Sequence, residues 1–274
     1  MKYLLTCTTA VLLLLQPTLP VLAQGAGSEW ELLSQEVNEL FRTGEYGRGV
    51  VVARKALEVA EKNVDPNHPD VATSLNNLAA LYHTQGQYTQ AEPLYKRALA
   101  ISEKALGPDH SSVAKSLNNL ASLYKAQGQY AQTEPLYKRS LAISEKVLGP
   151  DHPLVAASLN NLAELYRIQG RYTQAEPLYK RALAIFEKAL GPDHPSVAKS
   201  VNNLALLYNT QGQYAEAEPL FQRALAIDEK ALGPNHPNVA IDLNNLAVLY
   251  LATKRDKEAE ILLQRAARIR AIQR

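Results

Sequence analysis

The sequence predicts an all-α fold, a right-handed α-solenoid built from six stacked antiparallel helical hairpins. A Leu-Asn-Asn or Val-Asn-Asn tripeptide returns every 42 residues, and apolar residues recur at helical spacing between regularly placed glycines and prolines. The tripeptide begins at Leu75, Leu117, Leu159, Val201 and Leu243. A fixed period of this length indicates a repeated helical unit that buries its apolar face only by stacking on its neighbours. We therefore expect function on an extended surface, not in a pocket.

The first 23 residues predict a secretory signal peptide. Lys2 provides a charged start, residues 10–15 form an apolar run, and Val-Leu-Ala at 21–23 offers small residues for cleavage after Ala23. An uncleaved membrane anchor is the alternative, but threonines and prolines interrupt the stretch, which lacks about 20 continuous apolar residues. We expect a secreted or periplasmic protein, with residues 24–274 as the solenoid and no membrane span in the mature chain.

The composition of the mature chain excludes several function classes. Cleavage removes Cys7, the single cysteine, so disulfides, cysteine nucleophiles and cysteine-based metal sites are not expected. It also removes Lys2, which leaves 28 of the 29 basic residues against 27 acidic ones, a net charge of about +1. This balance does not indicate a nucleic-acid binder or a membrane-surface protein.

The first helix of each unit, called helix A, is clearest between residues 69 and 85. Pro69 stands in its first turn, where a missing N–H costs nothing, and Gly86 follows its end. Its apolar face at i, i+3, i+4 and i+7 consists of Leu75, Leu78, Ala79 and Tyr82.

The second helix, helix B, is predicted after the turn at Gly86. Pro93 lies near its first turn, and Gly107 with Pro108 ends it. Its buried face consists of Ala91, Leu94, Tyr95, Ala98, Leu99 and Ser102. Helices A and B then form an antiparallel hairpin.

Six such hairpins are predicted in the chain. They span about 29–67, 68–109, 110–151, 152–193, 194–235 and 236–274. The first is degenerate, with Ser34 and Gln35 in place of the two asparagines, and the last has Lys254 where the turn glycine stood. Atypical end units are typical of solenoid caps.

Together these residues resemble the tetratricopeptide repeat, whose pattern of large, small and aromatic positions is met by Leu75, Leu78, Ala79, Tyr82, Ala91, Tyr95 and Ala98. The 42-residue unit, with its Leu-Gly-Pro-Asp-His-Pro loop, is similar to the cargo-binding repeats of kinesin light chain and their prokaryotic relatives. The resemblance covers residue 28 onward. It implies a protein–protein interaction scaffold whose A helices line a concave, peptide-binding groove.

Within that groove, the first asparagine of each pair is expected to form a ladder that binds the backbone of an extended peptide, because a carboxamide both donates and accepts hydrogen bonds. The ladder consists of Asn76, Asn118, Asn160, Asn202 and Asn244. The alternative is that these asparagines bond to the neighbouring helix. For the second asparagine of each pair we favour that structural role.

The positions that vary along the groove are expected to set specificity. Basic residues occupy its middle, at Lys115, Lys125, Arg167 and Lys199, and Glu164 argues against a purely anionic preference. Apolar residues occupy its C-terminal end, at Leu206, Val248 and Leu251, and His83 and Asn209 complete the set. The hypothesis is an extended ligand, a protein or peptide segment, with acidic residues near the basic positions and an apolar anchor.

Two further patterns carry less weight. The histidines of the loops, one per repeat, lie too far apart to share a metal ion, and we expect each to cap the following helix. The basic pairs of the B helices, such as Lys96 and Arg97, alternate with glutamates, as on a solvated face with ion pairs. No cofactor, metal or nucleic acid is expected.

A binding scaffold without catalytic chemistry is therefore the predicted function. The alternatives are a self-associating structural solenoid of the cell envelope and, third, an enzyme. No phosphate-binding loop, dinucleotide fingerprint or nucleophile elbow is present in the sequence. The oligomeric state does not follow from the sequence.

Overall fold

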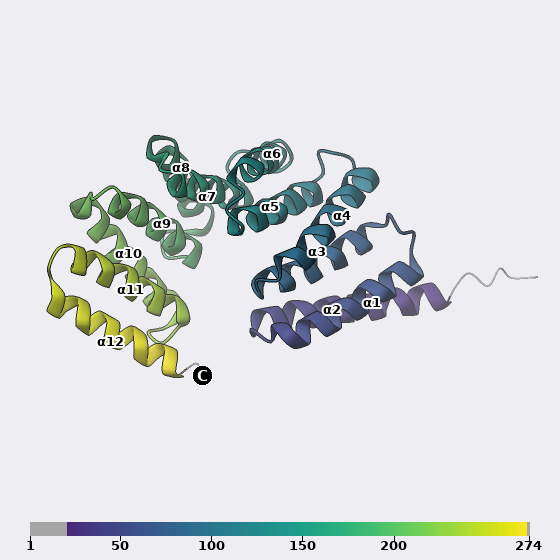
Figure 1. Cartoon of the computed structure of the whole chain (residues 1–274), viewed down its shortest axis with the longest axis horizontal. Helices are drawn as coiled ribbons and strands as arrows, with labels where there is room; N and C mark the ends of the chain where they lie inside the picture. Colours follow the sequence, from purple (N-terminus) through teal and green to yellow (C-terminus); the bar gives the residue numbers. More distant parts are fainter. Residues whose placement is uncertain (1–20, 273–274) are drawn as a thin grey trace, which may run out of the picture.

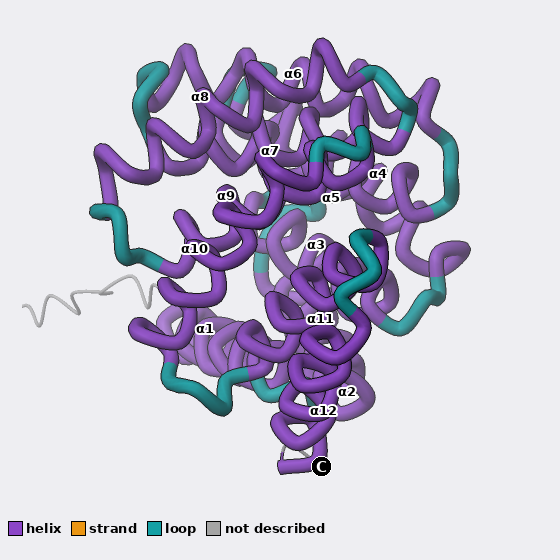
Figure 2. Tube along the Cα trace, turned by 90° about the vertical axis from the view of Figure 1, so that its left-hand side faces the viewer, coloured by secondary structure: helices purple, strands orange, loops and turns teal. Residues whose placement is uncertain are grey.

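Figure 1 shows the computed structural model, which describes residues 21–272, with side chains from residue 29 onward. Short loops join its helices (Figure 2). The helices are α1 (Val21–Arg42), α2 (Tyr46–Asn63), α3 (Pro69–Thr84), α4 (Tyr88–Leu106), α5 (Ser111–Ala126), α6 (Tyr130–Leu148), α7 (Pro153–Ile168), α8 (Tyr172–Leu190), α9 (Pro195–Thr210), α10 (Tyr214–Leu232), α11 (Pro237–Ala252) and α12 (Asp256–Ile272). They pair into six stacked hairpins, as predicted.

The hairpins follow one another along an arch, with α3 and α5 on its inner side and α4 and α6 further out (Figure 1). Each hairpin packs on the next through its helices. Residues 1–20 of the predicted signal peptide lie outside the described residues, and α1 begins at Val21, before the expected start of the first hairpin.

A histidine caps each A helix from the second hairpin onward, as the sequence predicted. Nδ1 of His68 accepts a hydrogen bond from the backbone N–H of Asp70 at 3.2 Å, and the backbone of His68 is extended. His110, His152, His194 and His236 repeat this contact at 3.1–3.2 Å. The imidazole thus satisfies an N–H that the first helical turn leaves without a partner.

Backbone conformation explains two of the turn positions. Gly107 ends α4 with φ +86° and ψ 157°, a region that only glycine adopts readily. Lys254 takes φ +61° in the turn of the last hairpin, where the other turns have glycine. A non-glycine residue there adopts the left-handed conformation at some energetic cost.

Aromatic side chains of the B helices fill the space between consecutive hairpins. Tyr95, Tyr137, Tyr179 and Phe221 occupy the same position in successive repeats and are at most 2% exposed. Leu263 holds that position in α12 and is 38% exposed, because no hairpin follows it in the described chain. The last described unit thus has an aliphatic side chain where the second to fifth units have a buried ring.

Ion pairs join the B helices of neighbouring repeats in a regular series. An arginine contacts a glutamate of the preceding B helix at 2.5–2.6 Å in the pairs Arg97–Glu61, Arg139–Glu103, Arg181–Glu145, Arg223–Glu187 and Arg265–Glu229. The adjacent lysines bond within their own helix, as Lys96 does to Glu92 at 2.7 Å. The predicted Lys-Arg pairs of the B helices are thus bonded to glutamates, which confirms the predicted ion-paired face.

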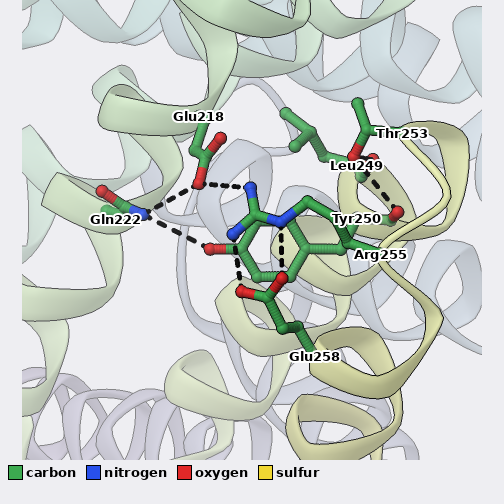
Figure 3. Close-up of polar contacts among 7 residues, drawn as sticks. All are labelled: Glu218, Gln222, Leu249, Tyr250, Thr253, Arg255 and Glu258. Atoms are coloured by element: carbon green, nitrogen blue, oxygen red, sulfur yellow. Dashed lines mark hydrogen bonds and ion pairs between the residues drawn. The ribbon is translucent and has the colours of Figure 1, made fainter.

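The turn of the last hairpin is held by Arg255 (Figure 3). Its guanidinium lies 3.8 Å from the ring centroid of Tyr250 and forms ion pairs with Glu218 of α10 at 2.8 Å and Glu258 at 2.6 Å. These carboxylates raise the pKa of Arg255. Arg255 therefore ties the final turn to the preceding repeat.

Candidate peptide-binding groove

The groove predicted from the sequence follows the odd-numbered helices α3 to α11. Lys115 on α5 and Lys199 on α9 are exposed, and Arg167 on α7 is half-buried. Within residues 29–272, no carboxylate forms an ion pair with any of these three cations. Their positive charge is therefore available to a ligand.

Of the first asparagines, Asn76 and Asn160 are buried and donate to the neighbouring repeat instead of projecting from the groove. Nδ2 of Asn76 donates to Oγ of Ser116 at 2.9 Å, and Nδ2 of Asn160 donates to Oγ of Ser200 at 2.7 Å. Both asparagines are 7% exposed. The helix-to-helix alternative thus describes these residues better than the ladder does, because their N–H donors are already engaged. Ligand contact by the ladder stays a prediction.

The second asparagines also bond between repeats, at alternate junctions. Nδ2 of Asn161 donates to Oδ1 of Asn118 at 2.8 Å, and Nδ2 of Asn245 donates to Oδ1 of Asn202 at 3.0 Å. Asn202 is buried, while Asn118 is half-buried. These contacts fit the structural role favoured for the second asparagine.

Asn244 lies on α11 in the last hairpin and is half-buried. The Oδ1 atoms of Asn76 and Asn160 are buried without a hydrogen-bond partner among the described residues. Their acceptors therefore remain unsatisfied within the described chain.

Lys125 does not offer the free charge that the sequence suggested. Its Nζ contacts Oε2 of Glu164 on the next A helix at 2.6 Å, and its side chain is only 19% exposed. The glutamate that argued against a purely anionic preference therefore neutralises this lysine.

Nearby, His83 is half-buried, with its ring 5.6 Å from that of Tyr88 and edge-on to it. Burial, and then the charge of Lys125, lower the pKa of His83, so this ring adds little positive charge to the groove at neutral pH.

The C-terminal end of the groove is apolar and open to solvent. Val248 is 52% exposed and Leu251 is 47% exposed, both on α11. Ile241 on the same helix is 53% exposed and was not among the predicted anchor residues. Its spacing from Val248, two helical turns, was the signal that could have included it. Leu206 and Asn209 of α9 are half-buried.

Among residues 21–272 no three His, Cys, Asp or Glu side chains gather where they could hold a metal ion. None of the helices within that range is long and apolar enough to cross a membrane.

The tetratricopeptide repeat profile matches residues 40–104, 75–132, 112–188, 156–230 and 196–271. The chain belongs to the tetratricopeptide repeat family. Members of this family generally act as protein–protein interaction scaffolds without enzymatic activity. A comparison with curated protein sequences finds no match.

Among solved structures, BtubC (BKLC) of P. vanneervenii is 28% identical with a TM-score of 0.64, over 84% of this chain and 90% of that protein. A kinesin light chain-like protein of Podosopora anserina, with nearly identical TPR-like repeats, is 30% identical with a TM-score of 0.61, over 77% of this chain and 98% of that one. Both support the resemblance to kinesin light chain repeats.

A Rap protein complexed with Competence and Sporulation Factor is 18% identical with a TM-score of 0.64, over 90% of this chain and 76% of that one. At this level of identity, it shows a shared fold.

Proposed function

We propose that this tetratricopeptide repeat protein binds an extended segment of another protein along its A helices and has no chemistry of its own. Three cations without an ion pair among residues 29–272 carry the proposal, Lys115, Arg167 and Lys199, together with the exposed apolar residues Val248 and Leu251. Such a surface complements a segment with acidic residues and an apolar anchor.

Lys125 contributes less to this surface, because Glu164 already neutralises it. The preference for acidic ligands therefore rests on Lys115, Arg167 and Lys199. Recognition of the peptide backbone rests on the half-buried side-chain amides of Asn118 and Asn244. The neighbouring Rap protein, described as a complex with Competence and Sporulation Factor, is consistent with this mode of binding.

The proposal includes export of the protein, as a secreted or periplasmic chain, by a cleaved signal peptide. It rests on the sequence of residues 1–23, whose order of charged, apolar and small residues is that of a signal peptide. Mass spectrometry of the protein from the cell envelope should show a chain that begins at Gln24. A chain retaining Met1 would contradict export by cleavage.

Fluorescence anisotropy with labelled 15-residue peptides tests the binding mode. The double variant Lys115→Glu with Lys199→Glu should weaken binding of an acidic peptide at least tenfold, and added salt should reduce binding to the parent. The matched control reverses two exposed lysines outside the groove, Lys62 and Lys104. Equal binding by both double variants would refute the basic groove.

The apolar end is tested separately. Val248→Ser with Leu251→Ser removes two side chains that are about half exposed, so the fold should persist. Peptides with an apolar anchor should lose affinity, whereas purely acidic peptides should not. Ile261→Ser, on the outer surface and 64% exposed, is the control. If this control weakens binding as much as the double variant does, the anchor lies elsewhere.

A further inference from the structure

A cavity of about 360 Å³ opens between α5, α6 and α7. Its volume falls in the range of small-molecule sites. Lys115 of α5 and Ala157 of α7 lie on its walls, together with Leu154, and Ser144 and Leu148 of α6 also line it. The sequence predicts a binding surface and gives no sign of this cavity.

Two small residues explain why the cavity exists at this junction. Position 144 of the B helix and position 157 of the next A helix are Ser and Ala here. At the four other junctions, the equivalent pairs are Ala60 with Thr73, Ser102 with Lys115, Phe186 with Lys199, and Asp228 with Ile241. The first pair is also small, but there Trp30 of α1 packs against the cluster that contains Ala60, and its Nε1 donates to Oγ of Ser74 at 2.7 Å. Each of the three other pairs includes a large side chain.

The neighbouring junction shows what size of group fits. Phe186 holds the position of Ser144 one repeat later and is buried, 8% exposed, in the core of that junction. Ser144 on α6 and Phe186 on α8 occupy the same position of the helical repeat. The space next to Ser144 therefore has the dimensions of an aromatic ring, which the protein itself supplies at Phe186.

The lining fixes the charge of a matching ligand. None of the residues that line the cavity is acidic, and Lys115 is the charged one. Several polar groups are already engaged, since Oγ of Ser140 donates to the carbonyl of Ala114 at 2.7 Å and Oγ of Ser158 donates to that of Leu154 at 3.1 Å. The ammonium of Lys115 is thus the strongest hydrogen-bond donor left for a ligand.

We propose that this junction cavity binds a monocarboxylic acid that carries an aromatic ring, with the ring against Ser144, Leu148 and Leu154 and the carboxylate at Lys115. Two sources share this chemistry: a free arylalkanoic acid, and the C-terminal residue of a peptide that ends in phenylalanine. The cavity shares Lys115 with the proposed peptide groove, but the inference rests on the space beside Ser144 and Ala157, which the groove proposal does not use.

Isothermal titration calorimetry with 3-phenylpropionate tests the site in the full mature chain. We expect saturable binding to the parent, about tenfold weaker binding to Lys115→Ala, and unchanged binding to the control Lys62→Ala, an exposed lysine of α2. The neutral 3-phenylpropanol should bind about tenfold more weakly than the acid. Absence of binding to the parent, or equal binding of acid and alcohol, would overturn the proposal.

Two variants close the cavity in different ways. Ser144→Phe introduces the ring found at Phe186, and Ala157→Lys introduces the residue found at positions 115 and 199. Both should abolish binding while circular dichroism stays that of the parent. If either folded variant bound 3-phenylpropionate like the parent, the ligand would not occupy this space, and the proposal would fail.

A final arm distinguishes the two sources. A tripeptide Gly-Gly-Phe with a free carboxylate is compared with its C-terminal amide and with 3-phenylpropionate. Tighter binding of the acid peptide than of 3-phenylpropionate would assign the site to a peptide terminus. The reverse order would assign it to a free acid. Loss of both on Ser144→Phe is expected in either case.

Discussion

Two buried carboxyl groups at the last junction should make the stability of this protein fall as the pH rises. Asp228 of α10 is 4% exposed and Asp242 of α11 is 5% exposed, and each has one carboxylate oxygen without a partner among the described residues. Burial, and then the neighbouring Asp228, raise the pKa of Asp242 to about 8. Burial also raises the pKa of Asp228.

The magnitude follows from the difference in proton binding between the folded and unfolded chain. An aspartate in an unfolded chain titrates near pH 4, so between about pH 4 and 8 the folded protein retains a proton that the unfolded chain has lost. The free energy of unfolding then decreases by about 1.4 kcal/mol per pH unit, and the difference between pH 4 and pH 7 reaches about 4 kcal/mol. The contribution of Asp242 is thus fully favourable below pH 4 and is lost as the pH rises to about 8.

The variant Asp242→Ser tests this reasoning, because serine occupies the same position in the preceding repeats, at Ser74, Ser116, Ser158 and Ser200. Urea unfolding followed by circular dichroism at pH 5 and pH 8 should show the variant gaining stability over the parent at pH 8 and gaining less at pH 5. Hydrogen exchange of residues 237–272 should slow at pH 8 relative to the parent after correction for intrinsic rates.

The other groups around the buried pair are the same in the parent and in Asp242→Ser. Glu229 and His236, which interact electrostatically with the pair, and Asn238, which hydrogen-bonds Asp228, are present in both proteins. Asp256→Ser, at an exposed position of α12, provides a control for the loss of one carboxylate. If Asp242→Ser kept the same dependence of stability on pH as the parent, the buried pair would not be the cause.

Three further changes have defined outcomes. Asn160→Ala removes the 2.7 Å hydrogen bond to Ser200 and should lower the free energy of unfolding in urea by about 1 kcal/mol, whereas no loss would mean that water replaces the bond. His152→Ala removes a helix cap and should cost about 1 kcal/mol, and asparagine at the same position should restore most of it, since its side chain also accepts from the backbone. Lys254→Gly relieves a backbone at φ +61° and should raise the midpoint of thermal unfolding. Ala267→Gly, at an exposed position in the interior of α12, should lower that midpoint, because glycine in a helix interior costs about 1 kcal/mol relative to alanine. Equal effects of the two glycine substitutions would contradict the strain at Lys254.

The sequence was sufficient to predict the helical hairpins because their signals are local. Pro69 at the start of a helix, His68 as its cap and Gly86 after its end each act on the backbone within a few residues. The 42-residue period then implies stacking without any knowledge of the interface. The structure confirms these helices and turns, so signals within a few residues of each helix end were enough to place them.

The candidate site was harder to predict, because it depends on contacts between repeats. On a helical wheel Asn76 projects beside the core stripe, yet its partner Ser116 lies 40 residues away and draws the amide inward. Lys125 is basic in the sequence, but Glu164, one repeat later, cancels its charge. Helical periodicity gives the direction of a side chain and not the identity of the residue it meets.

The series of ion pairs along the B helices has a consequence for how such a protein changes in length. Each arginine meets a glutamate of the preceding unit at the same offset, as Arg181 meets Glu145 and Arg139 meets Glu103. A gene that lost residues 110–151 in frame would bring Arg181 opposite Glu103, and the joint would be restored with the same pair of side chains. Unequal recombination between repeats can therefore shorten or lengthen the array by whole units without new compensating mutations.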